Sequence, residues 1–158
     1  MYKLFFKRLI DFIASLILLV LLLIPFLIIA ILIKLDSKGS IFYRQIRVGQ
    51  NCKEFKIFKF RTMVSNADKI GGYSTSKDDV RITKIGQFFR KTSLDELPQV
   101  INIILGDMSL IGPRPDVPAQ KINYTEDEWL KRHKVKPGIS GLAQCRNRHH
   151  ITNSGRKK

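Results

Sequence analysis

Residues 91–99 read KTSLDELPQ and place two adjacent carboxylates, Asp95 and Glu96, in a chain that is otherwise basic. Ser93, followed three residues later by Glu96, has the spacing of a capping box, which predicts that a helix begins here and ends near Gly106. In one interpretation Glu96 only caps this helix and Asp95 only complements its dipole. In the other, the two carboxylates form a functional site. The apolar residues that follow recur at helical spacing and predict the face that packs on a core; they are Leu97, Val100, Ile101, Ile104 and Leu105.

The composition predicts one domain with a modest core and an anionic partner. The 158 residues include 28 Lys and Arg against 13 Asp and Glu, a formal net charge of +15. Such a charge favours nucleic acid, anionic lipid or a phosphorylated substrate, and the apolar N-terminus argues against nucleic acid. Cys52 and Cys145 form no CxxC pattern and indicate a reducing compartment. The three histidines have no metal-ligand spacing.

Residues 12–33 carry no charged side chain and predict a membrane helix. At ~1.5 Å per residue they reach roughly 33 Å, about one hydrocarbon core, which is long for a buried core helix. Basic residues on both sides leave the positive-inside rule without an orientation for a straight span. Pro25 removes one N–H and is the natural break point, which favours a re-entrant helix with both ends in the cytoplasm. In either topology we expect the C-terminal side to be cytoplasmic.

Residues 41–63 cluster aromatic and β-branched side chains and predict a β-hairpin with its turn at residues 48–51. In the second strand, Phe60 faces one side and Lys59 the other. Arg61 shares the face of Lys59, and the two belong either to an ordinary solvated strand face or to a site. The two strands are predicted at residues 41–43 and 55–60.

Short helices and loops are predicted for the rest of the chain. Residues 85–91 favour a short helix, and the polar residues 66–79 favour a surface loop. Thr125 and Glu128 form a second capping box, which predicts a helix that continues to His133. Residues 136–141 contain two glycines and predict a turn.

Arg114 is flanked by prolines on both sides, Pro113 and Pro115. The prolines restrict the backbone around the arginine and therefore aim its side chain. A guanidinium held in this way suits phosphate, because its fork donates two hydrogen bonds in one plane.

These pieces, in this order, resemble the bacterial sugar transferases, the monotopic polyprenyl-phosphate phosphoglycosyl transferases. The resemblance covers residues 5–144, and several multi-residue motifs in a fixed order make it specific. The matching stretches are residues 5–12 (FFKRLIDF), 58–63 (FKFRTM), 90 with 93–99 (R and SLDELPQ), 106–109 (GDMS), 112–115 (GPRP) and 136–144 (KPGISGLAQ).

The resemblance implies a transfer of sugar 1-phosphate from a UDP-sugar to polyprenyl (undecaprenyl) phosphate on the cytoplasmic face of the bacterial inner membrane. This step initiates the assembly of a surface glycan or glycoprotein. Asp95 would carry a covalent phosphosugar and Glu96 would bind Mg²⁺. Lys59, Arg90 and Arg114 would bind substrate phosphate. Membrane lipid is an expected partner, and nucleic acid is not.

Three segments are expected from the pattern: a membrane helix at residues 1–37, an α+β, mainly helical catalytic domain at 38–144, and a basic tail at 145–158. The tail departs from the family pattern after Gln144, which predicts a C-terminally truncated chain of low stability and activity. Two alternatives remain open at this point. One is an inactive membrane fragment of this family, and the other is a non-enzymatic basic protein that binds anionic lipid.

Overall fold

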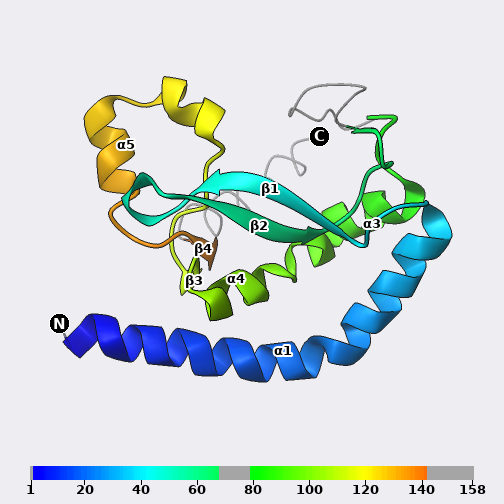
Figure 1. Cartoon of the computed structure of the whole chain (residues 1–158), viewed down its shortest axis with the longest axis horizontal. Coiled ribbons are helices and arrows are strands. Elements are labelled where there is room, and N and C mark those ends of the chain that lie inside the picture. The colour runs from blue at the N-terminus through cyan, green and yellow to red at the C-terminus, as the bar shows by residue number, and fades with distance from the viewer. Residues whose placement is uncertain (1, 68–78, 142–158) are drawn as a thin grey trace, which may run out of the picture.

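The computed structural model describes residues 2–67 and 79–141, and it has an α+β fold built along one helix (Figure 1). That helix, α1 (Tyr2–Asp36), is long and apolar enough to cross a membrane by length and composition. It bends partway along its length, and Pro25 inside it accounts for the bend because its ring displaces the preceding turn. Most of the predicted loop at residues 66–79, and the tail after Gln144, lie outside the described residues.

The predicted hairpin is confirmed. Strands β1 (Phe42–Val48) and β2 (Glu54–Phe60) pair in antiparallel register, with Phe42 opposite Phe60. The first strand is longer than predicted, because its alternating polar residues pair fully with β2. A short 3-10 helix, η1 (Gln50–Cys52), joins the strands.

The segment that carries the two carboxylates differs from its prediction. Helix α3 (Lys84–Thr92) ends at Ser93, whose backbone is left-handed with φ 61°. A 3-10 turn, η2 (Leu94–Glu96), follows and leads into α4 (Gln99–Leu105), which ends at Gly106 with φ 98° as predicted. The Ser93 side chain makes no cap hydrogen bond, so the capping-box prediction is wrong. The reason is that Ser93 closes the preceding helix rather than opening the next one.

A small parallel sheet completes the domain. Strand β3 (Ser109–Ile111) pairs with β4 (Gly138–Ser140), where the sequence predicts only a turn. A Cβ on Gly138 would lie 2.1 Å from the Gly112 nitrogen, so glycine is required at this close approach. Between the strands lie a 3-10 helix, η3 (Pro118–Asn123), and α5 (Glu126–Arg132), whose predicted capping box is confirmed.

Helix α1 contacts the domain with both of its halves. In its second half, Ile29 and Ile33 are buried in one core cluster with Phe60 and Phe89. In its first half, Arg8 donates to the Ile103 carbonyl at 2.5 Å and also to that of Ile104, so it satisfies the open carbonyl end of α4. A second core cluster of Ile57, Ile103 and Met108 lies between β2 and α4.

Candidate active site

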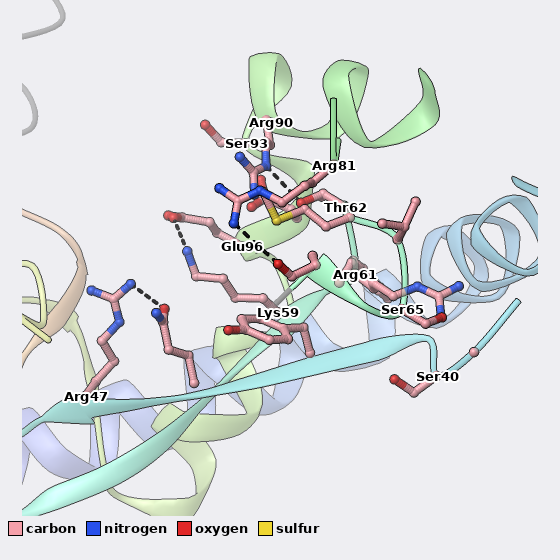
Figure 2. Close-up of a pocket in the computed structure, with 18 of the residues that line it drawn as sticks. Ser40, Arg47, Lys59, Arg61, Thr62, Ser65, Arg81, Arg90, Ser93 and Glu96 are labelled. Atoms are coloured by element: carbon pink, nitrogen blue, oxygen red, sulfur yellow. Dashed lines mark hydrogen bonds and ion pairs between the residues drawn. The ribbon is translucent and has the colours of Figure 1, made fainter. Parts of the chain in front are cut away.

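A pocket of about 540 Å³ opens where the hairpin meets the α3–η2 segment (Figure 2). The strands supply one wall, because alternate residues of a strand share a face. The end of α3 and the η2 turn supply another wall. The structure brings together all five residues that the sequence predicts for the site; they are Lys59, Arg90, Asp95, Glu96 and Arg114.

Asp95 lies in η2 and its side chain is nearly buried, with 9% of the residue exposed. Burial raises the pKa of the Asp95 carboxyl above 3.8, although the charges of Lys59 and Arg90 act in the opposite direction. The neighbouring Glu96 also raises it. Asp95 is therefore a partly desolvated carboxylate, which is a more reactive state than one in water.

Glu96 makes two ion pairs and does not cap a helix. Its Oε1 lies 2.8 Å from Lys59 Nζ and 2.6 Å from Arg114 Nη2. Burial raises the pKa of Glu96, but Lys59 and Arg114 outweigh that effect and hold it below 4.5. Its two cationic partners therefore keep Glu96 ionised to lower pH than an unpaired glutamate.

The three predicted cations reach the pocket from three different elements. Lys59 extends from β2 toward Glu96 (Figure 2). Arg90, on the last turn of α3, donates from Nε to Thr62 Oγ1 at 2.8 Å, which fixes its guanidinium beside Asp95. Arg114 comes from the loop after β3 and its side chain is 50% exposed.

The pocket is also lined by Arg47 and Arg61, which the sequence analysis did not assign to the site. Arg47 donates to Gln45 Oε1 at 2.7 Å and to the Pro115 carbonyl. Arg61 donates to the Ser37 carbonyl at 2.6 Å and so ties the end of α1 to the hairpin. A signal for Arg47 was present in the sequence. Alternate residues of β1 share a face, and Tyr43 on this face is paired with Lys59 across the hairpin. The residues of β1 on this face that line the pocket are Tyr43, Gln45 and Arg47.

The chemistry of the donor set suits Mg²⁺. Within residues 2–67 and 79–141, no group of three or more acidic, His or Cys side chains is placed to hold a metal. Two adjacent carboxylates nevertheless stand in a basic pocket. Mg²⁺ is usually held by one or two carboxylates, with substrate phosphates and water supplying the remaining oxygens. Glu96 and Asp95 fit that arrangement.

The arrangement as a whole has the charge that suits an anionic group such as phosphate. Several cations surround two adjacent carboxylates, Asp95, which is desolvated by burial, and Glu96, which is paired with Lys59 and Arg114. Cations of this kind stabilise charge on transferring phosphoryl groups.

The comparisons with known proteins identify the family. A family model described as "Bacterial sugar transferase" matches residues 2–158. The chain is 46% identical over 143 residues to a UDP-glucose:undecaprenyl-phosphate glucose-1-phosphate transferase of Klebsiella pneumoniae, which covers 88% of this chain and 30% of that protein. It is 45% identical over 147 residues to the exopolysaccharide production protein PSS of Rhizobium leguminosarum bv. phaseoli, which covers 89% of this chain and 73% of that protein. The chain therefore belongs to the bacterial sugar transferase family.

A third relative carries a different sugar in its name. The UDP-N-acetylgalactosamine-undecaprenyl-phosphate N-acetylgalactosaminephosphotransferase of Aeromonas hydrophila is 42% identical over 142 residues, which covers 89% of this chain and 34% of that protein. The chain thus spans only part of the length of these relatives. The family match extends over the tail after Gln144, whose departure from the family pattern stays a prediction.

Proposed function

We propose that this protein transfers a sugar 1-phosphate from a UDP-sugar to undecaprenyl phosphate, the initiating step of bacterial surface glycan assembly. The observation that carries the proposal is the pair of adjacent carboxylates with opposite pKa shifts, Asp95 raised and Glu96 lowered, in a pocket lined by arginine and lysine. The names of the relatives supply the substrates, a UDP-sugar and undecaprenyl phosphate.

In the first step, a carboxylate oxygen of Asp95 attacks the β-phosphorus of the UDP-sugar. The bond between that phosphorus and the bridging oxygen breaks, and UMP leaves with the bonding electrons. The sugar phosphate remains as an acyl phosphate on Asp95. Splitting one transfer between two large anions into two steps makes each step easier.

In the second step, a phosphate oxygen of undecaprenyl phosphate attacks the same phosphorus. The bond to Asp95 breaks, which restores the carboxylate and forms undecaprenyl diphosphate sugar. Both displacements are in line, so the acceptor phosphate must approach from the side that UMP vacated. One set of cations therefore serves the leaving phosphate and the attacking phosphate in turn.

The remaining side chains bind and orient the phosphates. Arg114 and Lys59 exchange part of their contact with Glu96 for phosphate oxygens, and Arg90 contacts phosphate beside Asp95. Glu96, with Asp95 next to it, would hold Mg²⁺. A bound Mg²⁺ neutralises phosphate charge that would otherwise repel a carboxylate nucleophile.

The position of α1 supports a re-entrant arrangement in the inner membrane, with the catalytic domain on the cytoplasmic face. Both halves of α1 contact the same domain, through Arg8 on one side of Pro25 and through Ile29 and Ile33 on the other. A straight span would carry one half away to the opposite face. An acceptor lipid could then reach the pocket without leaving the bilayer.

The test is UMP release by the purified protein in detergent or lipid vesicles, with Mg²⁺, undecaprenyl phosphate, and UDP-glucose or UDP-N-acetylgalactosamine. We expect Mg²⁺-dependent UMP release and a phosphosugar adduct on the protein when the acceptor is left out. Release of no UMP from any UDP-sugar would favour an inactive fragment of the family. Binding to anionic lipid without any UMP release would favour the basic membrane-surface protein.

A further inference from the structure

The loop that carries Arg114 is held by its backbone oxygens rather than by secondary structure. Residues 113–116 contain two prolines, so half of the loop has no N–H to donate. The Pro113 carbonyl accepts from the Gly138 N–H at 2.9 Å, and the Asp116 carbonyl accepts from the Val48 N–H at 2.9 Å. These two bonds fix the ends of the loop to β4 and to β1.

Two arginine side chains hold the middle of the loop. Arg132 Nη2 donates to the carbonyl of Arg114 itself at 3.0 Å. Arg47 Nη1 donates to the Pro115 carbonyl at 3.0 Å. The carbonyl oxygens of residues 113–116 therefore all accept hydrogen bonds. The carbonyl of Arg114 itself accepts from Arg132.

Arg132 is itself oriented by a buried carboxylate. Asp116 is 6% exposed, and its Oδ2 accepts from Arg132 Nε at 2.5 Å. One guanidinium therefore bridges the Asp116 carboxylate and the Arg114 carbonyl, which lysine could not do with the same planar geometry. His133 Nε2 lies 3.7 Å from the same carboxylate oxygen.

Helix α5 provides a fixed base for Arg132, because its end is tied to the hairpin. The Asn51 N–H donates to the His133 carbonyl at 2.7 Å, and Gln50 Nε2 donates to the Lys134 carbonyl at 3.0 Å. Figure 1 shows α5 beside the β1–β2 connection. The same hairpin carries Lys59. Lys59 and Arg114, the two cations that contact Glu96, are therefore both positioned by the hairpin.

We propose that Arg132, oriented by Asp116, is a positioning residue that holds Arg114 in place for the diphosphate of the nucleotide-sugar donor. The proposal rests on the proposed function for its substrate. The half-exposed Arg114 side chain is not packed in a core, so its placement depends on its backbone and on its ion pair with Glu96. A displacement of ~1 Å at such a contact can cost about 10²-fold in rate.

The experiment combines kinetics with a double-mutant cycle. We expect Arg132→Ala to raise the KM for the UDP-sugar and to lower kcat/KM by between about 10-fold and 10²-fold. Asp116→Asn, which keeps the side-chain volume, should give a smaller loss of the same kind. In an Arg114→Ala background, Arg132→Ala should have little further effect, because residues that act through one another are non-additive. Lys121→Ala is the control, since the Lys121 side chain makes an exposed ion pair between η3 and α5, with Glu126, away from the loop.

A second measurement keeps this inference separate from the proposed function. Deuterium uptake at the Gly138 and Val48 N–H groups, which donate to the Pro113 and Asp116 carbonyls of the loop, should rise in Arg132→Ala and Asp116→Asn, with uptake in α5 unchanged. Unchanged uptake at these two N–H groups, or multiplicative effects of Arg114→Ala and Arg132→Ala on kcat/KM, would overturn the positioning role. A wild-type protein that releases no UMP would overturn the proposed function alone, and the uptake would still decide the positioning of the loop.

Discussion

Asp95 and Glu96 are neighbours in the chain but differ in electrostatic environment. Burial raises the pKa of Asp95, and the partners Lys59 and Arg114 lower that of Glu96 despite its burial. A carboxyl whose pKa is raised by folding adds stability only at low pH and loses it as pH rises through the folded-state pKa. A carboxyl whose pKa is lowered adds stability that is present at neutral pH and is lost as pH falls through the folded-state pKa.

The first prediction is that replacing each carboxylate by its amide, in Asp95→Asn and in Glu96→Gln, changes activity and stability in different ways. Asp95→Asn should abolish UMP release and the phosphosugar adduct, yet raise the thermal midpoint, because it removes a buried charge at neutral pH. Glu96→Gln should mainly weaken Mg²⁺-dependent UMP release and should lower the thermal midpoint, because it weakens the ion pairs with Lys59 and Arg114. Thermal unfolding and UMP release are measured on both variants.

Asp127→Asn is the matched control for this prediction, because Asp127 is an exposed carboxylate in the first turn of α5. It should change neither property appreciably. Equal turnover by the wild type and Asp95→Asn would show that Asp95 is not the nucleophile.

The second prediction concerns pH. In the proposed mechanism the attacking form of Asp95 is ionised, so UMP release should fall as pH drops through a pKa that lies above 3.8. Lys59 is the strongest of the charges that lower this pKa, so Lys59→Met should move the acid-side midpoint to higher pH as well as reduce the rate. The rate is measured as a function of pH for both proteins, with Lys121→Met as control. A midpoint that stays in place in Lys59→Met would contradict the assignment of this limb to Asp95.

At the scale of elements, the packing of α3 on the end of β2 places the two carboxylates. A Cβ on Gly86 would lie 2.1 Å from the backbone oxygen of Thr62, so α3 can approach this closely only with glycine there. The third prediction is that Gly86→Ala displaces α3, and with it Arg90 and the η2 turn. We expect a loss of about 1–3 kcal/mol in the free energy of unfolding, typical of overpacking.

UMP release should fall together with stability in Gly86→Ala, since Arg90 loses its contact with Thr62. Gln87→Ala, at the neighbouring exposed position on the same helix, is the control and should be close to wild type. Wild-type stability and activity in Gly86→Ala would mean that the close approach is not needed.

Elements whose signal is local were predicted correctly from the sequence. The hairpin follows from alternation in residues 41–63, and the start of α5 follows from Thr125 and Glu128, whose side chains and backbones bond each other as the capping box requires. The end of α4 at Gly106 follows from the freedom of glycine at positive φ.

The elements that were missed depend on partners distant in the chain. Glu96 has the spacing of a cap, but its oxygens pair with Lys59 and Arg114, which local spacing cannot reveal. In the part of the chain that the structure describes, the three-residue strands β3 and β4 pair with each other alone, and they are separated by 26 residues of sequence, 112–137. The resemblance to the sugar transferases, rather than any local pattern, gathered the five candidate site residues, whereas the roles of these residues stay predictions.

The fourth prediction concerns the topology of α1. Because Arg8 and Ile33 contact the same domain, we expect both ends of the helix on the cytoplasmic side. A single cysteine from Lys3→Cys, in a background with Cys52→Ser and Cys145→Ser, should react with a membrane-impermeant thiol reagent only after spheroplasts are permeabilised. Labelling in intact spheroplasts would indicate a straight span.

At the scale of the whole molecule, two forces draw the protein to a membrane, and they respond differently to salt. A net charge of +15 attracts anionic lipid, and this attraction is screened at high ionic strength. The apolar side chains of α1 are mostly exposed outside the contacts with the domain, and each is worth roughly 1.5–3 kcal/mol when it leaves water. Because α1 carries many such side chains, we expect their burial to contribute more to membrane binding than the electrostatic attraction does.

The fifth prediction is therefore that the protein stays bound to neutral phosphatidylcholine vesicles in about 1 M salt, where the Debye length is about 3 Å. Retention is measured by flotation, with vesicles that contain anionic phosphatidylglycerol for comparison, and detergent should release the protein from both. Replacing three exposed apolar residues of α1, Leu21, Ile24 and Leu27, by serine should weaken retention on neutral vesicles. Replacing the exposed Lys53 and Lys131 by glutamine should affect only the anionic vesicles at low salt. Release of the wild type from both kinds of vesicle by salt alone would show that charge, and not α1, holds it on the membrane, and this outcome would favour the basic surface protein over a transferase with an embedded helix.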